Sequence, residues 1–185
     1  MNYSFYGTCA DDSLHFLDCL ETMVRQTIKP KQIILVYAGD KNIEIQIKKK
    51  LTNFGINLVY ISKKLSRVDS LNLALENSLA KYSFRFDART RFSYKYAEEA
   101  LKFLEDKTIN ASVVGGVPLI LEEKNSIEGR LCARILSSYY IFFYPNHRNK
   151  YFNGYSSSVY LGCFNTNLLK KICLLYTSDA ADEHG

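Results

Sequence analysis

The sequence has 185 residues, of which 47% are hydrophobic and 23% are charged. This balance is typical of a folded globular chain and excludes disorder as the main state. The formal net charge of +5 favours an anionic ligand or surface as a partner.

Neither a membrane-spanning segment nor an export signal is predicted. The longest apolar run, Tyr139 to Tyr144, is much shorter than a bilayer requires. The first residues lack a basic region followed by a long apolar core, so we expect no secretory signal and a cytoplasmic protein. The five cysteines show no C-x-x-C spacing, which argues against a zinc site and against a disulfide scaffold.

Strands and helices are expected to alternate along the first two thirds of the chain. Tyr3 to Thr8 predicts a strand, and Asp11 or Asp12 can cap the helix that follows. The run QIILVY, from Gln32 to Tyr37, is typical of a parallel strand buried on both faces. The expected strands are residues 3–8, 32–37, 56–61, 82–86 and 111–117, and the expected helices cover about 14–24, 43–54, 70–79 and 94–104.

This alternation predicts an α/β fold with a Rossmann-like, doubly wound and mostly parallel sheet that has helices on both faces. After Pro118 the rhythm changes to a helix over 127–137, an aromatic stretch, a polar loop and a last strand over 159–164. In open sheets of this kind the ligand lies beyond the carboxyl ends of the strands. The segments at those ends are residues 8–12, 37–41, 62–67 and 87–91.

The segment DARTR, directly after the fourth strand, carries the clearest chemistry. Asp87 can bind a ribose hydroxyl or a divalent ion, while Arg89 and Arg91 can hold a diphosphate in bidentate fashion. The alternative is that Asp87 caps a turn and that both arginines are solvated.

Several pieces of the chain, taken in order, resemble one enzyme family. From Gln26 the chain has QTIKPKQIILVYAG, with a Q-T-x-x-P turn before an apolar strand. From Arg67 it has RVDSLNLALENSLAKYSFRFDAR, with R-x-x-x-x-N-x-A before a strand that ends in D-A-R. VVGGVP and Gly162-Cys163-Phe164 follow. Together these pieces resemble the family 2 glycosyltransferases, most of all the succinoglycan glucosyltransferase type, whose D-A-H replaces the usual D-x-D.

The resemblance covers nearly all of residues 1–172 and implies the GT-A form of the predicted fold. It implies a nucleotide-sugar-binding half over residues 1–118 and the start of an acceptor-binding half over 119–172. It also implies inverting transfer of a sugar from a nucleotide diphosphate donor, usually a UDP-sugar, to a glycan or lipid-linked acceptor. Such transfer serves surface polysaccharide synthesis for the bacterial cell envelope, and a lipid-linked acceptor would bring the protein to the inner face of the membrane.

The resemblance also implies roles for particular residues. Thr8 lies beside the nucleotide, Arg67 faces the base or phosphate, and Asp87 is the first Asp of D-x-D. The family's metal-binding second Asp is Arg89 here, and a guanidinium has no lone pair to offer a cation. A divalent Mg or Mn ion is therefore implied by the family but opposed by Arg89, with Asp87 as the candidate ligand. Arg89, with Arg67 and Arg91, can instead supply positive charge to a leaving diphosphate.

Two further departures from the family concern the base and the catalytic group. The acidic pair that follows the second strand in the family is Tyr37-Ala38 here, so recognition of uracil depends on Asp40. The general base that activates the acceptor belongs to a later motif and is expected beyond Ile172. No catalytic residue is therefore assigned, and this chain is expected to bind donor without turning it over.

The last residues, 173–185, are expected to be a non-native tail. Cys173 to Glu183 is CLLYTSDAADE, and one DNA sequence that encodes it is similar to the reverse complement of a transposase adapter used to prepare sequencing libraries. Residues 1–172 contain all 24 Lys and Arg but only 16 of the 19 acids, because Asp179, Asp182 and Glu183 lie in the tail. Their net charge is +8.

Other functions remain open at this stage. The alternative to an enzyme is a catalytically degenerate module that binds a sugar nucleotide or a glycan. Nucleic-acid binding rests on charge alone, because no helix-turn-helix, RNP-type or zinc-finger pattern is present, and we expect no nucleic-acid partner. Lys48 to Lys50 with Lys63 and Lys64 can touch an anionic membrane or form a solvated face. Tyr139 to Tyr144 can line an acceptor pocket, touch a membrane or lie in the core.

Overall fold

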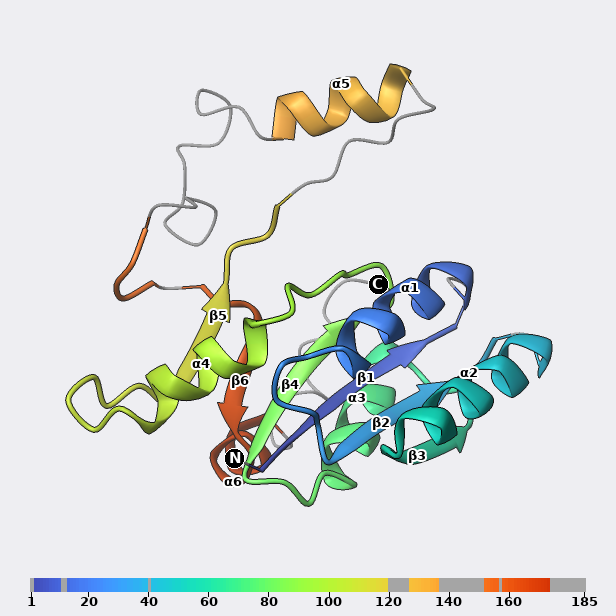
Figure 1. Ribbon diagram of the computed structural model, residues 1–185, viewed down its shortest axis with the longest axis horizontal. Helices are drawn as coiled ribbons and strands as arrows, with labels where there is room; N and C mark the ends of the chain where they lie inside the picture. Colours follow the sequence, from blue (N-terminus) through green and yellow to red (C-terminus); the bar gives the residue numbers. More distant parts are fainter. Residues whose placement is uncertain are drawn as a thin grey trace. The chain divides into compact units, whose positions relative to one another are not determined.

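The computed structural model (Figure 1) describes residues 2–10, 13–39, 41–119, 127–136, 152–156 and 158–173. Asp11 and Asp12, which were expected to cap the first helix, lie outside the described residues, as do Asp40 and the stretch from Tyr139 to Tyr144. So do residues 174–185 of the expected tail.

Strands and helices alternate as the hydrophobic pattern predicts. The strands are β1 (Tyr3–Cys9), β2 (Gln32–Tyr37), β3 (Asn57–Ser62), β4 (Tyr82–Asp87), β5 (Val113–Gly116) and β6 (Tyr160–Asn165). The helices are α1 (Ser13–Val24), α2 (Lys41–Phe54), α3 (Arg67–Glu76), α4 (Tyr96–Glu105), α5 (Ile127–Leu136) and α6 (Thr166–Cys173).

The sheet has the strand order β3-β2-β1-β4-β6-β5, and Figure 1 shows its first four strands side by side. β1 pairs in parallel with both β2 and β4, and β2 pairs in parallel with β3. β6 runs antiparallel to β4. Every residue of β2 is buried, as a strand covered on both faces requires. The predicted doubly wound, mostly parallel sheet is confirmed.

Helices cover both faces of the sheet. On one face α1, α2 and α4 pack on a cluster that includes the fully buried Phe5 and Phe84. On the other face a smaller cluster joins Ile34 of β2 to Ala74 of α3 and Leu169 of α6. Each large apolar side chain that is fully buried stabilises the fold by about 1.5–3 kcal/mol.

Buried hydroxyl groups fasten α6 to the sheet on the α3 side. Ser4 of β1 and Ser83 of β4 both bond to Ser78 Oγ, at 2.6 and 2.9 Å, and Ser83 Oγ also bonds to Thr166 Oγ1 at 2.8 Å. All four hydroxyls are buried, and each has a partner, so their burial carries no unmet hydrogen bond. Lys170 adds bonds from Nζ to the carbonyls at the end of α3.

α3 begins earlier than the hydrophobic pattern predicts. Its first residue is Arg67 rather than Ser70, because Ser66 caps the helix: Ser66 Oγ accepts from the Asp69 amide at 3.1 Å and donates to the Asp69 carboxylate at 2.7 Å. Arg67 therefore lies in the first turn of a helix and not in a loop. This fixes the direction in which its side chain leaves the backbone.

α6 was not predicted. It follows β6 directly, and the Asn165 side chain caps it by accepting from the amides of Asn167 and Leu168 at 3.1 and 3.2 Å. The helix runs through Ile172 to Cys173, one residue into the expected tail. Such short helices depend on packing, and Leu169 supplies it.

The chain divides into two compact units. The first consists of Met1–Val114 with Leu161–Gly185, and the second is Gly115–Tyr160. Within the second unit the backbone passes so close to Val159 that a Cβ atom on Gly115 would collide with it. None of the described helices combines the length and apolar character that crossing a membrane demands.

A close backbone approach in the first unit occurs where Gly7 of β1 pairs with Phe86 of β4. A Cβ on Gly7 would lie 2.6 Å from the Phe86 carbonyl oxygen and 2.8 Å from its ring. Backbone cannot move aside as a flexible side chain can, so Gly7→Ala should lower the free energy of unfolding by about 1–3 kcal/mol. Urea denaturation followed by circular dichroism measures the loss.

Gly55 provides the matched control, because it has a φ of +65° and no atom within 4 Å of its Cβ position. Asn accepts that backbone conformation, so Gly55→Asn should change the free energy of unfolding by less than about 0.5 kcal/mol. Equal losses in the two variants would show that the β1–β4 approach does not limit side-chain size.

Candidate functional site

The site predicted at the carboxyl ends of the strands has a definite centre in the structure. From β1 the chain runs outward to β2 and β3, then returns to β4 on the other side of β1. The carboxyl ends of the adjacent strands β1 and β4 are therefore the topological switch point, where sheets of this kind bind ligands. Thr8 and Asp87 are paired across it in register. Two of the predicted donor-binding residues thus lie side by side at this point.

The polarity of the sheet changes at the same place. The row of residues through Thr8 and Asp87 continues through β2 and β3 as Val36 and Ile61, on the face that packs against α3. The half of this row on β2 and β3 is apolar, and the half on β1 and β4 is polar. A polar ligand is therefore favoured over β1 and β4.

Two arginines hold the Asp87 carboxylate. Its Oδ1 atom accepts from Arg67 Nη2 at 3.2 Å and lies 3.4 Å from Arg85 Nη2. The side chain of Asp87 is 34% exposed, and that of Arg67 is 68% exposed. The three groups form a partly open cluster with one surplus positive charge, and we call Arg67, Arg85 and Asp87 the arginine–aspartate cluster. Such a cluster attracts an anion more strongly than a cation.

The backbone beneath this carboxylate is fixed by two bonds. The Asp87 carbonyl accepts from the Thr90 amide at 2.9 Å, which closes a turn, and from the Cys19 thiol of α1 at 3.6 Å. The main chain of Asp87 therefore begins a turn, while its carboxylate bonds to Arg67 and Arg85. Its side chain remains partly open to solvent.

The two later arginines of DARTR take different positions. Arg89 is exposed in the turn after β4. Arg91 pairs with Asp18 of α1, so the structure directs its guanidinium to that carboxylate rather than to Asp87. Of the predicted donor-binding residues, Thr8, Arg67 and Asp87 are thus brought together in the described part of the chain.

Arg85 was missed by the sequence analysis. Its signal was present, because an arginine interrupts the aromatic strand YSFRFD two residues before Asp87. Side chains two apart on a strand share a face, which is why both reach the α3 side of the sheet.

The end of β2 does not carry the acidic group that the sequence resemblance implies for recognition of the base. The Tyr37 side chain is buried with its ring 5.8 Å from that of Tyr60, and the Ala38 amide donates to the Cys9 carbonyl. Asp40, the expected substitute, is not among the described residues. Recognition of a base therefore has no assigned residue in the part of the chain that the structure describes.

The described residues do not suit a divalent metal ion at this site. They contain no group of three or more His, Cys, Asp or Glu side chains placed to hold a metal. Asp87 already faces two guanidinium groups, which would repel a cation. Arg89 adds a third positive side chain nearby in the sequence, without a lone pair to donate.

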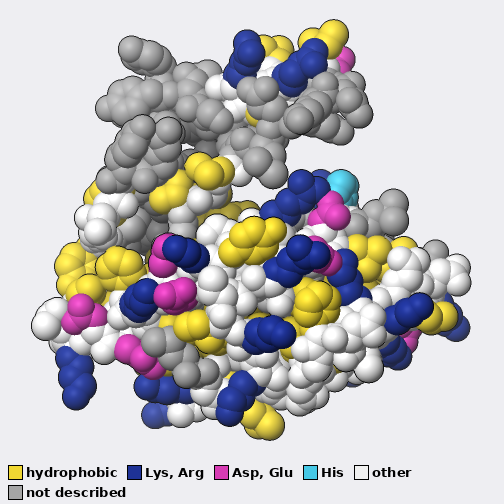
Figure 2. Space-filling view, in the orientation of Figure 1, with side chains coloured by type: hydrophobic (Ala, Val, Ile, Leu, Met, Phe, Trp, Pro, Cys, Tyr) yellow, Lys and Arg dark blue, Asp and Glu magenta, His cyan; other side chains and the backbone are white. Residues whose placement is uncertain are grey.

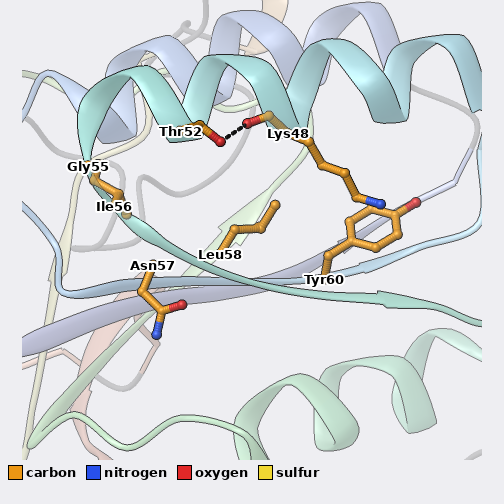
Figure 3. Close-up of a pocket in the computed structure, with 7 residues that line it drawn as sticks. All are labelled: Lys48, Thr52, Gly55, Ile56, Asn57, Leu58 and Tyr60. Atoms are coloured by element: carbon orange, nitrogen blue, oxygen red, sulfur yellow. Dashed lines mark hydrogen bonds between the residues drawn. The ribbon is translucent and has the colours of Figure 1, made fainter.

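A groove outside this site lies between α2 and the edge strand β3, three strands away from Asp87 in the sheet order (Figure 3). In it Lys48 Nζ lies 4.5 Å from the centre of the Tyr60 ring, and Thr52 Oγ1 donates to the Lys48 carbonyl at 2.9 Å. The groove is lined by Lys48, Thr52, Gly55, Ile56, Asn57, Leu58 and Tyr60. Its position on the outer edge separates it from the switch point.

Comparison with solved structures finds the same fold elsewhere. TarS from S. aureus in complex with UDP matches with a TM-score of 0.59 and 16% identity, covering 92% of this chain and 48% of that chain. The mannosyltransferase PcManGT from Pyrobaculum calidifontis, in complex with GDP-Man and Mn2+, matches with a TM-score of 0.60 and 13% identity, covering 92% and 46%. TarS in complex with UDP-GlcNAc matches at 0.57 and 17%, covering 92% and 47%. No family model and no curated protein matches the chain.

These similarities confirm the GT-A fold expected from the sequence resemblance. At such low identity they concern the fold alone. The chain spans about half the length of each of these structures.

Cys19, which supports the backbone of Asp87, should be chemically inert in the folded protein. Burial, reinforced by the neighbouring Cys9, raises the pKa of the Cys19 thiol far above its usual range. The thiolate that attacks alkylating reagents is then absent at pH 8. Cys132 is exposed and should react before Cys19. Iodoacetamide labelling followed by peptide mass spectrometry measures both rates, and early labelling of Cys19 would show that α1 opens readily at the site.

Proposed function

We propose that this chain binds a nucleoside diphosphate sugar at the β1–β4 switch point. The observation that carries the proposal is the placement of Thr8, Asp87 and Arg67 together there, in a sheet with the GT-A fold. Solved neighbours of that fold carry UDP, UDP-GlcNAc and GDP-Man. These ligands support a nucleotide-sugar donor, and the sequence resemblance favours a UDP-sugar.

The chemistry of the site suits such a donor. A ribose hydroxyl can donate to the Asp87 carboxylate, and the Thr8 hydroxyl offers a second polar contact on the neighbouring strand. Loss of the sugar builds negative charge on the diphosphate, and fixed positive groups stabilise that charge. Arg67 supplies one such group, while Arg89 and Arg91 are proposed to supply others.

We propose inverting transfer to a glycan or lipid-linked acceptor, in the synthesis of surface polysaccharide, as the activity to which this donor site belongs. Inversion requires a general base near the acceptor hydroxyl, and the resemblance places that base beyond Ile172. The site described above then contributes donor binding and leaving-group stabilisation.

A lipid-linked acceptor would bring the protein to the inner face of the cytoplasmic membrane. Of the lysines proposed to contact anionic lipid, Lys48 pairs with Glu44 and Lys50 with Glu21, while Lys63 and Lys64 are exposed. Figure 2 shows Lys and Arg side chains spread over the visible face, several of them beside carboxylates. A weak, peripheral contact fits this distribution better than a strong one.

Donor binding without transfer is the second candidate function. It is favoured by the buried Tyr37, which stands where the family places an acidic residue for the base. The two functions are separated by release of UDP from a UDP-sugar on addition of glycan acceptors, measured on a protein that also carries the segment after Ile172, where the general base is proposed to lie. In that protein, binding without release supports the module, and release supports the enzyme.

The role of Asp87 can be tested with a conservative variant. Asp87→Asn should weaken UDP binding about 10- to 100-fold, because a hydrogen bond to a charged group contributes about 1.5–3 kcal/mol. Pyrophosphate binding should not weaken, since pyrophosphate has no ribose and the change leaves more positive charge at the site. Isothermal titration calorimetry measures both ligands.

The matched control is Asp106→Asn, because Asp106 follows the far end of α4 and an Asn keeps its turn-forming bond to Thr108. Its UDP affinity should equal that of the wild type. Unchanged UDP binding by Asp87→Asn would remove Asp87 from the donor site.

The role of metal can be tested in the same assay. Addition of manganese or of chelator should change the affinity for a UDP-sugar by less than about twofold, because Arg89 replaces the second carboxylate. Arg89→Asp restores D-x-D and should make binding depend on manganese. A large loss of wild-type affinity on adding chelator would contradict the proposal and point to a cation held by Asp87.

A further inference from the structure

We propose that Arg85 is a diphosphate-binding residue of this site, which holds Asp87 when the site is empty and contacts the donor's phosphates when it is filled. The proposal rests on the proposed function for the identity of the donor. Neither the sequence motifs nor the fold comparisons assign Arg85 a role.

The position of Arg85 in the sheet is the first argument. The row of residues through it crosses four parallel strands on the α3 face, one row before Thr8 and Asp87. Its other members pack in the smaller core cluster. The row is Val59, Ile34, Tyr6 and Arg85.

An arginine at the end of an apolar row costs stability through desolvation of its charge. A volume-matched apolar side chain would extend the core cluster without that cost. A charged residue that interrupts an apolar row of a sheet usually has a functional role.

The contacts of Arg85 are the second argument. Its Nη2 atom lies 3.4 Å from Asp87 Oδ1, longer than the 3.2 Å from Arg67 Nη2 to the same oxygen. Its Nε atom is buried and meets no acceptor among the described residues. A buried N–H without a partner is rare in folded proteins and calls for a specific explanation. Asp87 therefore accepts a hydrogen bond from Nη2 of Arg85 but leaves its Nε–H group without an acceptor.

The charge of the cluster is the third argument. Arg67 alone can neutralise Asp87, so the second guanidinium leaves a surplus positive charge at the switch point. A nucleoside diphosphate brings the opposite charge. A planar guanidinium can offer two N–H donors as a fork that matches two phosphate oxygens, whereas a lysine offers a single point charge. The side chain of Arg85 is 36% exposed, so part of it is open to a ligand, while its buried Nε can reach a phosphate only when the side chain turns away from Asp87.

A role as a mere counter-ion for Asp87 is the alternative. It predicts that loss of Arg85 disturbs Asp87 and therefore affects every ligand that uses Asp87, including uridine. The proposed phosphate contact predicts a loss confined to ligands that carry phosphates. The two interpretations therefore differ in which ligands are affected.

The test compares uridine, UDP and pyrophosphate, titrated into the wild type and into Arg85→Met and Arg85→Lys by ligand-observed NMR and calorimetry. Arg85→Met keeps the length of the stem and removes the charge. It should weaken UDP and pyrophosphate binding at least about tenfold while changing uridine binding less than about twofold. Arg85→Lys should weaken both phosphate ligands by an intermediate factor, because it keeps the charge and loses the fork.

Arg25→Met is the matched control. Arg25 pairs with Glu21 at the end of α1 that lies away from the switch point, and its loss should leave all three affinities unchanged. Thermal unfolding of each variant confirms that it is folded. Should Arg85→Met fail to fold, the loss in Arg85→Lys carries the test.

The outcomes separate this proposal from the one on which it rests. UDP binding by the wild type that Arg85→Met does not weaken overturns the role of Arg85 and leaves donor binding intact. Equal losses for uridine and UDP also overturn it, in favour of the counter-ion. If the protein binds pyrophosphate in a way that depends on Arg85 but does not bind UDP, the phosphate contact is supported. The proposal that the donor is a nucleoside diphosphate sugar is then overturned. A wild type that binds none of the three ligands overturns both proposals.

Discussion

The pairing of β1 with β4 is the interaction on which the rest of the structure depends. It joins the strands β3, β2 and β1 to the strands β4, β6 and β5, and it places Thr8 beside Asp87 in register. It requires Gly7, because the backbone of Phe86 leaves no room for a side chain there. The hydroxyls of Ser4 and Ser83 on the same pair of strands, bridged by Ser78, then anchor the layer that contains α3 and α6. The site and the packing below it therefore share one strand pair.

Electrostatics distinguishes this site from one built around a metal ion. A pair of carboxylates attracts a cation, which then neutralises a diphosphate. Here a single carboxylate lies between two guanidinium groups, so positive charge is already part of the protein. Fixed charge of this kind needs no separate binding step, and its contribution depends on how firmly the side chains are held. Ser66 caps α3 and makes Arg67 the first residue of that helix, which helps to hold the Arg67 side chain in place.

The fold and the site support the function to different degrees. GT-A neighbours establish the architecture, but one fold can serve several functions, and their identity to this chain is low. Particular residues therefore support the proposed donor site. Asp87 and Arg67 lie together at the switch point, the buried Tyr37 stands where the sequence resemblance implies an acidic residue, and Arg85 adds a cationic group that the motifs did not include.

The sequence by itself determined the order of strands and helices, the parallel sheet and the strand end that bears Asp87, because hydrophobic periodicity and turn residues act locally. It did not reveal the helix α6, whose stability comes from packing of Leu169 and the hydroxyl of Thr166. Only the tertiary structure decided that Arg67 and Arg85 meet one oxygen of Asp87 while Arg91 turns to Asp18. Arg85 and Asp87 share β4, but the pairs Arg67–Asp87 and Arg91–Asp18 join segments far apart in the sequence. Strand order and register, which no local pattern encodes, bring those segments together.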